Sequence, residues 1–402
     1  MDSVSPELAQ IVFRGRLFDG ERAVDQGTVV VDEESGKVSD AGKQQEVEVP
    51  KGAKVVAPEG VTILPGLVDA HMHFFGTGTY GLADWVLIPD TLTALRAVPD
   101  MRRMLSGGFT AVRDLGSKAG TFISRAEREG AIEGPRVVSA AKSLAQTGGD
   151  DDLTILPLDI SQRLSYSYYC DGPWECRKAV RMCLRDGAEV IKVYASGSFA
   201  QGKKARQQLT VEELKAIVDE AHRAEVKVAA HAYSEAALSN VIEAGVDSIE
   251  HGIGLTDEIA ARAVKRGIYY VPTLSAFFAA KPSTNVERET FIRRHLTEDM
   301  RIAKEQGLKL VNGTDFVGSE DEPLGQNYRE VVNMAKFFGA EAALAAATST
   351  AMDCLGLEGG RLRPGSPADV VVVKGDPARR PEDLAPQNVL YVVKGGRVFK
   401  AP

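Results

Sequence analysis

Four of the six histidines in this 402-residue sequence stand where short apolar segments end; they are His71, His73, His231 and His251. His71 and His73 are separated by one residue. Because side chains alternate along a strand with a period of two, both imidazoles point to the same side. Neutral imidazole is a common ligand of zinc and other transition metals. Two imidazoles at this spacing can chelate one metal ion.

Lys192 and Asp315 complete the candidate site. Lys192 lies inside the apolar segment 190–194, where burial favours the neutral amine over the cation. A neutral amine can react with carbon dioxide to form a carbamate, whose two oxygens would bridge two metal ions. Asp315 ends the segment 311–315, where it is placed to bind one ion and to accept a proton from a metal-bound water. The alternatives are a lysine paired with a buried carboxylate and a capping or turn aspartate.

The segments that carry these residues belong to a longer alternating pattern. From about Gly66 to Gly360, short apolar segments alternate with amphipathic helical stretches, which indicates βα units and a parallel sheet. Eight such segments can be counted: 68–73, 110–114, 136–140, 190–194, 227–231, 248–251, 268–273 and 309–315. We therefore predict an α/β fold with a (β/α)₈ TIM barrel, which typically needs about 250 residues. The four histidines would then meet at its catalytic, C-terminal face.

The two ends of the chain have a different pattern. Residues 8–62 and the last forty residues contain short alternating strands with turn residues between them. We expect both ends to form one small discontinuous β-sandwich, residues 1–62 and 361–402, with the barrel over residues 63–360. Inside the barrel, Thr210 and Glu213 form a capping box that begins a helix. The stretch 143–171 is rich in Gly, Asp and Tyr, lacks periodicity and is expected to be a lid.

Composition narrows the class of protein and its partners. With 44% apolar and 26% charged residues, the chain is typical of a soluble globular protein. The net charge of −8 is spread along the chain, so neither nucleic acid nor an anionic membrane surface is expected as a partner. No signal peptide or membrane span is apparent. The four cysteines show no CxxC spacing, so we expect a cytoplasmic protein without disulfides.

Taken together, the motifs resemble the amidohydrolase superfamily over essentially the whole chain. They lie at residues 65–73, 192, 231–233, 249–252, 313–315 and 365–372. Within the superfamily the chain is most similar to the metal-dependent Xaa-Pro dipeptidase-like, imidazolonepropionase-related branch, which includes ochratoxin-hydrolysing amidases. Segments 110–116 and 212–222 support this placement.

The resemblance implies a binuclear metal centre, usually of zinc, that is bridged by a carbamate on Lys192. The implied ligands of the more buried ion are His71, His73 and Asp315, and those of the more exposed ion are His231 and His251. A metal-bridging hydroxide would attack the substrate, and Asp315 would take up the proton and return it to the leaving amine. Tyr233 would donate a hydrogen bond to the developing oxyanion, although it could instead be a packing residue.

The sequence departs from this branch in one loop. Relatives commonly carry a histidine after a Thr-Gly-Gly turn, thought to help hold the substrate carboxylate, whereas this chain has Asp150, Asp151 and Asp152. Three acids would repel a carboxylate, which argues against simple dipeptides with a free C-terminus. Arg113 is a candidate to compensate by binding substrate. The other candidates are basic residues of a later loop, namely Lys203, Lys204 and Arg206.

The predicted function is hydrolysis of an amide bond in a dipeptide or an N-acyl amino acid by two divalent ions. One alternative is hydrolysis of a cyclic amide or a lactone, or deamination, on the same scaffold. Deaminases of this superfamily generally use one metal ion and do not need Lys192. A second alternative is an assembly scaffold without activity. Zinc is expected, although manganese, cobalt or iron would also suit the ligands. The expected partners are a small-molecule substrate and further copies of the chain.

Overall fold

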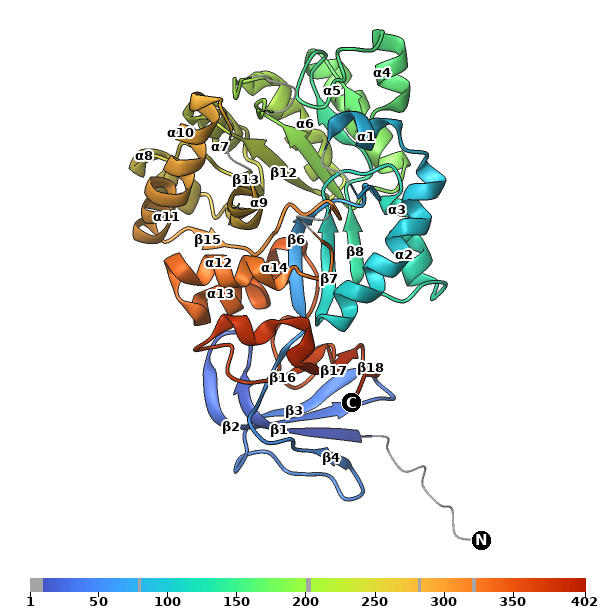
Figure 1. Ribbon diagram of the computed structural model, residues 1–402, viewed down its shortest axis with the longest axis vertical. Coiled ribbons are helices and arrows are strands. Elements are labelled where there is room, and N and C mark those ends of the chain that lie inside the picture. The colour runs from blue at the N-terminus through green and yellow to red at the C-terminus, as the bar shows by residue number, and fades with distance from the viewer. Residues whose placement is uncertain (1–9, 79–80, 200–203, 281–282, 320–322) are drawn as a thin grey trace. The chain divides into compact units, whose positions relative to one another are not determined.

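The computed structural model describes residues 10–402 except for 79–80, 200–203, 281–282 and 320–322, and it has a mixed α/β architecture (Figure 1). By their contacts, the residues divide into two compact units. One contains the chain up to Val68 together with Arg102–Ala111 and Gly325–Pro402, and the other contains Asp69–Met101 and Val112–Leu324. The domain limits drawn from the sequence, after residues 62 and 360, stay a prediction.

In the first unit, the two ends of the chain pair into one sheet of eight strands. Its order is β18-β17-β16-β5-β1-β2-β3, with β4 also paired to β1. The ends join where β5 and β16 run antiparallel, with Ile63 opposite Val372. The strands are β1 (Gln10–Phe18), β2 (Ala23–Asp32), β3 (Lys37–Lys43), β4 (Lys54–Val56), β5 (Val61–Pro65), β16 (Val370–Lys374), β17 (Val389–Lys394) and β18 (Arg397–Lys400). The predicted pairing of the chain ends is confirmed.

These eight strands form one hydrogen-bonded sheet, whereas the predicted sandwich implies two separate sheets. The reason lies in β1, which pairs with β2 along one edge and with both β4 and β5 along the other. Alternate residues of β2, Val29 and Val31, are fully buried with Ile63 and Val370 in the core of this unit. This alternation of buried side chains explains why the sequence of β2 predicts a strand.

Two further sheets carry the segments that were predicted as barrel strands. Their orders are β6-β7-β8 and β10-β9-β11-β12-β13-β14-β15, and every neighbouring pair in the second is parallel. The strands are β6 (Leu67–Met72), β7 (Phe109–Asp114), β8 (Arg136–Ser139), β9 (Ser143–Ala145), β10 (Ser167–Tyr169), β11 (Val190–Tyr194), β12 (Lys227–Ala232), β13 (Ser248–His251), β14 (Tyr269–Val271) and β15 (Lys309–Leu310). Each of the eight predicted segments overlaps one of these strands.

Helices follow most of the parallel strands along the chain (Figure 1). They are α1 (Leu82–Leu87), α2 (Asp90–Ser106), α3 (Gly120–Arg128), α4 (Leu158–Leu164), α5 (Pro173–Arg185), α6 (Val211–Arg223), α7 (Glu235–Ala244), α8 (Asp257–Lys265), α9 (Leu274–Ala279), α10 (Val286–Arg294), the π-helix η2 (His295–Asp299), α11 (Met300–Gln306), α12 (Tyr328–Phe338), α13 (Ala340–Ala346), α14 (Ser349–Leu355) and the 3₁₀ turns η3 (Pro381–Leu384) and η4 (Pro386–Asn388). The predicted capping box at Thr210 and Glu213 is present at the start of α6. None of the helices in the described part of the chain combines the length and the apolar character that a membrane span needs.

The segment 143–171 differs from the expected lid without regular structure. It contains β9, α4 and β10. The two strands form because residues 143–145 pair with residues 167–169 and also with β11. Directly after β10, Cys170 forms a disulfide with Cys176 of α5. The expectation that no cysteines pair was therefore wrong, since a spacing of six residues at a strand–helix junction gave no recognisable motif.

Candidate active site

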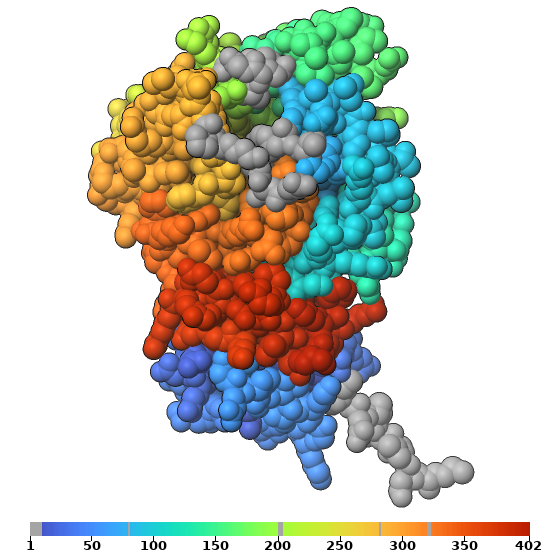
Figure 2. Space-filling model, in the orientation of Figure 1, coloured from blue at the N-terminus to red at the C-terminus, as the bar shows by residue number. Residues whose placement is uncertain are grey.

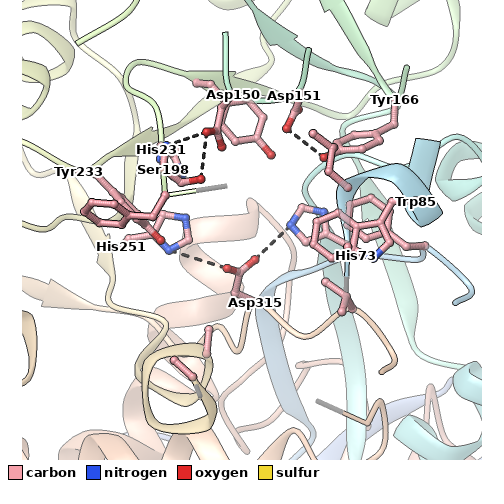
Figure 3. Close-up of a pocket in the computed structure, with 18 of the residues that line it drawn as sticks. His73, Trp85, Asp150, Asp151, Tyr166, Ser198, His231, Tyr233, His251 and Asp315 are labelled. Carbon is pink, nitrogen blue, oxygen red and sulfur yellow. Dashed lines mark hydrogen bonds and ion pairs between the residues drawn. The ribbon is translucent and has the colours of Figure 1, made fainter. Parts of the chain in front are cut away.

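The ends of the parallel strands bring all six predicted metal ligands to one cavity of about 790 Å³ (Figure 3). The ligands that lie in strands are His71 of β6, Lys192 of β11, His231 of β12 and His251 of β13. His73 and Asp315 follow β6 and β15 in the chain. Because these strands are neighbours or near neighbours in parallel sheets, their carboxyl ends open on the same side.

Asp315 is the residue around which the ligands gather. Its Oδ1 is 3.2 Å from Nε2 of both His71 and His73, and its Oδ2 is 4.0 Å from Nδ1 of His251. Ligand atoms of His71, His251 and Asp315 all lie within 4.8 Å of one another, so one cation could contact all three. Asp315 has a φ of 60° and His251 a φ of 65°. Left-handed backbone at residues other than glycine is strained and occurs often at functional sites.

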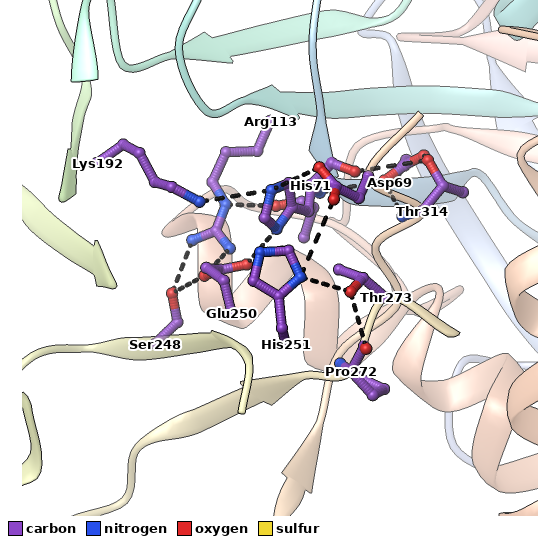
Figure 4. A network of polar contacts seen from close by, with 12 residues as sticks. Asp69, His71, Arg113, Lys192, Ser248, Glu250, His251, Pro272, Thr273 and Thr314 are labelled. Carbon is purple, nitrogen blue, oxygen red and sulfur yellow. Dashed lines mark hydrogen bonds and ion pairs between the residues drawn. The ribbon is translucent and has the colours of Figure 1, made fainter. Parts of the chain in front are cut away.

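Asp69 fixes the loop that carries Asp315 (Figure 4). Its carboxylate accepts hydrogen bonds from the backbone N–H groups of His71 and Thr314, both at 3.1 Å, and from the Thr314 hydroxyl at 2.7 Å. The N–H of Asp315 in turn donates to the carbonyl of His71 at 2.7 Å. The position of Asp315 is therefore set by buried polar bonds and does not depend on its own side-chain contacts alone.

Two histidines have one ring nitrogen fixed by a group that can only accept. Nδ1 of His71 lies 2.8 Å from a carboxylate oxygen of Glu250, and Nδ1 of His73 lies 2.9 Å from the carbonyl of Gly116. Carboxylate and carbonyl oxygens have no proton to donate, so Nδ1 of each ring carries the hydrogen. Nε2 of each ring faces Asp315 Oδ1 at 3.2 Å, so it is the nitrogen that would bind a metal ion in its deprotonated form.

His251 is oriented through Thr273. Nδ1 of His251 lies 2.7 Å from the Thr273 hydroxyl, which itself donates to the carbonyl of Pro272 at 2.8 Å. The hydroxyl therefore accepts from His251. The same Pro272 carbonyl lies 2.9 Å from Nε2 of the buried His295 in η2. Thr273 has a φ of 51°, which is a real outlier for a β-branched residue.

Buried, neutral nitrogen atoms are available for metal binding at this site. Nε2 of His231 is buried and has no hydrogen-bond partner among the described residues. Burial, together with the Lys192 cation, lowers the pKa of His231 well below the usual imidazole value, and burial does the same for His251. Nζ of Lys192 lies 3.5 Å from Nε2 of His71, and burial lowers the pKa of this amine. Neutral imidazoles beside a carboxylate suit a divalent transition metal.

Arg113 lies in a buried hydrogen-bond network beside His71 (Figure 4). It is not one of the described residues that line the cavity. It donates to Glu250 at 2.8 Å, to the carbonyl of Ala70 at 2.6 Å and to the Ser248 hydroxyl at 3.1 Å. Burial alone would raise the pKa of Glu250, but the Arg113 charge and the bond from His71 lower it to about 2. This position does not support the predicted substrate contact of Arg113: it neutralises the carboxylate that orients His71.

The sequence analysis assigned no role to Glu250, although a signal was present. Ser248 and Glu250 share one face of β13, and Arg113 lies inside the equally buried β7. A buried carboxylate and a buried guanidinium each need a partner of opposite charge, so the two could have been paired from the sequence.

Aromatic residues form two walls on opposite sides of the ligands (Figure 3). On one side, the Trp85 cluster comprises Phe75, Leu82, Trp85, Leu153, Tyr166 and Val317. On the other side, the Phe277 cluster comprises Phe199, Tyr233, Phe277 and Ile292. Phe75 stacks between His73 and Trp85, with ring centroids 4.8 and 4.6 Å away, and Tyr233 stacks on His231 at 4.3 Å. Tyr233 thus lies where its predicted contact with substrate is possible.

The acidic loop lies partly in the cavity wall. Asp150 and Asp151 line the cavity, and both are almost completely buried. Asp150 accepts from the N–H and the hydroxyl of Ser198 at 2.7 and 2.9 Å. Asp151 accepts from the Tyr166 hydroxyl at 2.9 Å, and burial raises its pKa. Asp152 is bonded instead to the N–H of Gly148 at 2.8 Å.

The basic loop that was considered as a carboxylate site does not reach the cavity in the part that the structure describes. Lys204 is exposed, with its Nζ 3.7 Å from a carboxylate oxygen of Glu287, and Arg206 is exposed as well. Lys203 lies outside the described residues.

A family comparison agrees with this geometry: residues 62–399 match the model of the Amidohydrolase family, and the chain belongs to that family. It is a hydrolase, and the family is generally metal-dependent. The chain is 31% identical to an ochratoxinase of Aspergillus niger over 85% of its own length and 76% of the relative's. The crystal structure of A. niger ochratoxinase superposes with a TM-score of 0.89 at 26% identity, covering 98% of this chain and 96% of that one. A prolidase complexed with N-methylphosphonate-L-proline superposes with a TM-score of 0.88 at 29% identity, covering 98% of this chain and all of that one.

Proposed function

We propose that the chain hydrolyses an amide bond in a dipeptide or an N-acyl amino acid with the help of two divalent metal ions, zinc being the first candidate. The observation that carries this proposal is the convergence of four histidines, a lysine and an aspartate at one cavity. His71, His73 and Asp315 would hold the more buried ion, and His231 and His251 the more exposed one. A carbamate on Lys192 would bridge them, which requires the neutral amine that burial favours.

The bound ions would supply a water molecule of lowered pKa and polarise the substrate carbonyl. The side chains of the protein do the remaining work. The Asp315 carboxylate, which is 21% exposed, accepts the proton of that water and returns it to the departing amine. The Tyr233 hydroxyl donates to the carbonyl oxygen as negative charge develops on it. The Trp85 and Phe277 clusters exclude water and receive the apolar parts of the substrate on either side of the scissile bond.

We also propose that the parallel strands close into an eightfold barrel. Backbone hydrogen bonds join the two sheets on both sides and support this proposal. Glu189 donates to the carbonyl of Ser139, which links the start of β11 to β8, and Ala70 of β6 donates to the carbonyl of Asn312 just after β15. The expectation of a homo-oligomer also belongs to the proposal and rests on the family resemblance alone. The expected cytoplasmic location stays a prediction, and the disulfide between Cys170 and Cys176 removes the cysteine argument for it.

Metal depletion tests the proposed function. The purified protein is stripped with a chelator, reloaded with zinc or manganese, and assayed on a panel of dipeptides and N-acyl amino acids for release of the C-terminal amino acid. We expect activity to disappear with the metal and to return on reloading. Unchanged hydrolysis after complete metal loss would refute the proposal. One ion per chain without a carbamate would favour deamination, and no hydrolysis of any panel member by the loaded protein would remove the assigned substrate class.

A further inference from the structure

Arg288 is the one arginine among the described residues that line the cavity. It belongs to α10, a helix at the molecular surface in which no residue from Val286 to Arg294 is buried. Figure 2 shows the gold segment around this helix at the surface. Arg288 and Ile292 are one helical turn apart, and both line the cavity, so one face of α10 contributes to its wall. The Arg288 side chain is 23% exposed, which places its guanidinium at the edge between solvent and cavity.

Charge is distributed unevenly around this cavity. Apart from the six candidate metal ligands, the charged residues of its described lining are Asp150, Asp151 and Arg288. Asp151 accepts from Tyr166 of the Trp85 cluster, and Asp150 accepts from Ser198, which precedes Phe199 of the Phe277 cluster. Arg288 lies on the helix that contributes Ile292 to the Phe277 cluster. Besides Lys192, Arg288 is thus the residue of the described cavity lining whose cation can attract an anionic group of a substrate, and its helix contributes to the Phe277 cluster.

The guanidinium group is suited to a carboxylate. Nη1 of Arg288 lies 2.6 Å from a carboxylate oxygen of Glu289. A guanidinium has five N–H donors in a planar fork, so it can bind Glu289 and a second carboxylate at the same time. Glu289 is partly exposed, which weakens its competition for Arg288 in comparison with a carboxylate inside the cavity.

We propose that Arg288 binds the α-carboxylate of the amino acid that hydrolysis releases. The side chain of that amino acid then packs against the Phe277 cluster, and the acyl group lies against the Trp85 cluster. This inference rests on the proposed function and adds to it the orientation of the substrate and a residue that selects for a free carboxylate. It gives Arg288 the role for which Arg113 and the basic loop were candidates.

The experiment compares two substrates in three variants. A hydrolysed N-acyl amino acid from the panel and its C-terminal carboxamide are assayed side by side, both scored by release of the same acyl product. The variants are Arg288→Gln, Arg288→Lys and, as a matched control, Arg293→Gln, which removes an exposed arginine of the same helix that is not in the described cavity lining. Metal content and melting temperature are measured for each protein.

We expect Arg288→Gln to lower kcat/KM for the carboxylate substrate about 10- to 100-fold, mainly through KM, because charge-assisted hydrogen bonds to substrate are the strong ones. The carboxamide should change less than about threefold, Arg288→Lys should recover part of the loss, and Arg293→Gln should behave as the wild type. Equal losses on both substrates, or no loss on either, would overturn the inference and leave the proposed function standing. A wild-type protein that hydrolyses neither substrate would overturn both.

Discussion

The ion pair between Arg113 and Glu250 offers a sharp test of how the metal ligands are held. Both side chains are almost completely buried, and their charged atoms are 2.8 Å apart. With an effective dielectric constant of about 20, Coulomb's law gives an attraction of about 6 kcal/mol at that distance. The lowering of the Glu250 pKa from 4.5 to about 2 corresponds to about 3 kcal/mol. Arg113→Met removes the cation and leaves the carboxylate buried, so we expect a destabilisation of about 3–5 kcal/mol.

The pH dependence has a defined sign. The folded-state pKa of Glu250 lies below its unfolded value, so its stabilisation is fully present above about pH 4.5 and is lost as the pH falls towards 2. Without Arg113, the largest effect that lowers this pKa is lost, so the pKa of Glu250 should rise. The stability difference between Arg113→Met and the wild type should therefore be largest near pH 7 and shrink below about pH 4.5.

Thermal unfolding of metal-free protein at several pH values measures this difference. With an unfolding entropy of about 2.1 cal/mol/K per residue over 402 residues, the melting temperature should fall by roughly 4–6 °C at pH 7. The double variant Arg113→Met/Glu250→Gln removes both charges and should be at least about 1 kcal/mol more stable than Arg113→Met alone. A melting temperature of Arg113→Met within 1 °C of the wild type, which corresponds to less than roughly 1 kcal/mol, would show that the pair does not hold this part of the fold. A double variant less stable than the single one would show the same.

Four further variants test the site. Lys192→Ala should reduce the bound metal from about two ions per chain to one or fewer by elemental analysis, and two retained ions would contradict the bridging role. Asp315→Asn should lower kcat about 10²- to 10⁴-fold, and turnover near the wild-type rate would exclude it as the proton carrier. Tyr233→Phe should lower kcat about 10²-fold with little change in KM, and an effect on KM alone would indicate packing. Trp85→Ala should raise KM for substrates with an aromatic acyl group more than for acetyl substrates, and equal changes would place the acyl group elsewhere.

The metal ligands could be predicted because the four histidines and Asp315 end apolar segments, and Lys192 interrupts another one. His71 and His73 occupy alternate positions of one such segment, and this spacing alone puts both beside the same aspartate. The eight strand segments were equally readable, since residues of buried parallel strands form continuous apolar runs.

Other features left no local mark. β9 and β10 have three residues each, too few to show a period, and they are stabilised by pairing across more than twenty residues. The depth of Arg113 could not be read from its strand, because alternation gives the face of a residue but not its distance from the cavity. Arg288 follows no motif, and only the path of α10 brings it to the site. The left-handed Thr273 is held by tertiary contacts that no sequence pattern reveals.

The left-handed conformations of His251, Thr273 and Asp315 each cost on the order of 1–3 kcal/mol, which the rest of the molecule must offset. Selection for heat resistance alone would therefore favour glycine or asparagine in place of Thr273, since both residues tolerate this conformation. A protein with glycine at this position would be more stable to heat, but it would lack the hydroxyl that accepts from Nδ1 of His251, so this imidazole would rotate more freely. Engineering of this enzyme thus has to score turnover together with thermostability, because at this position the two are opposed.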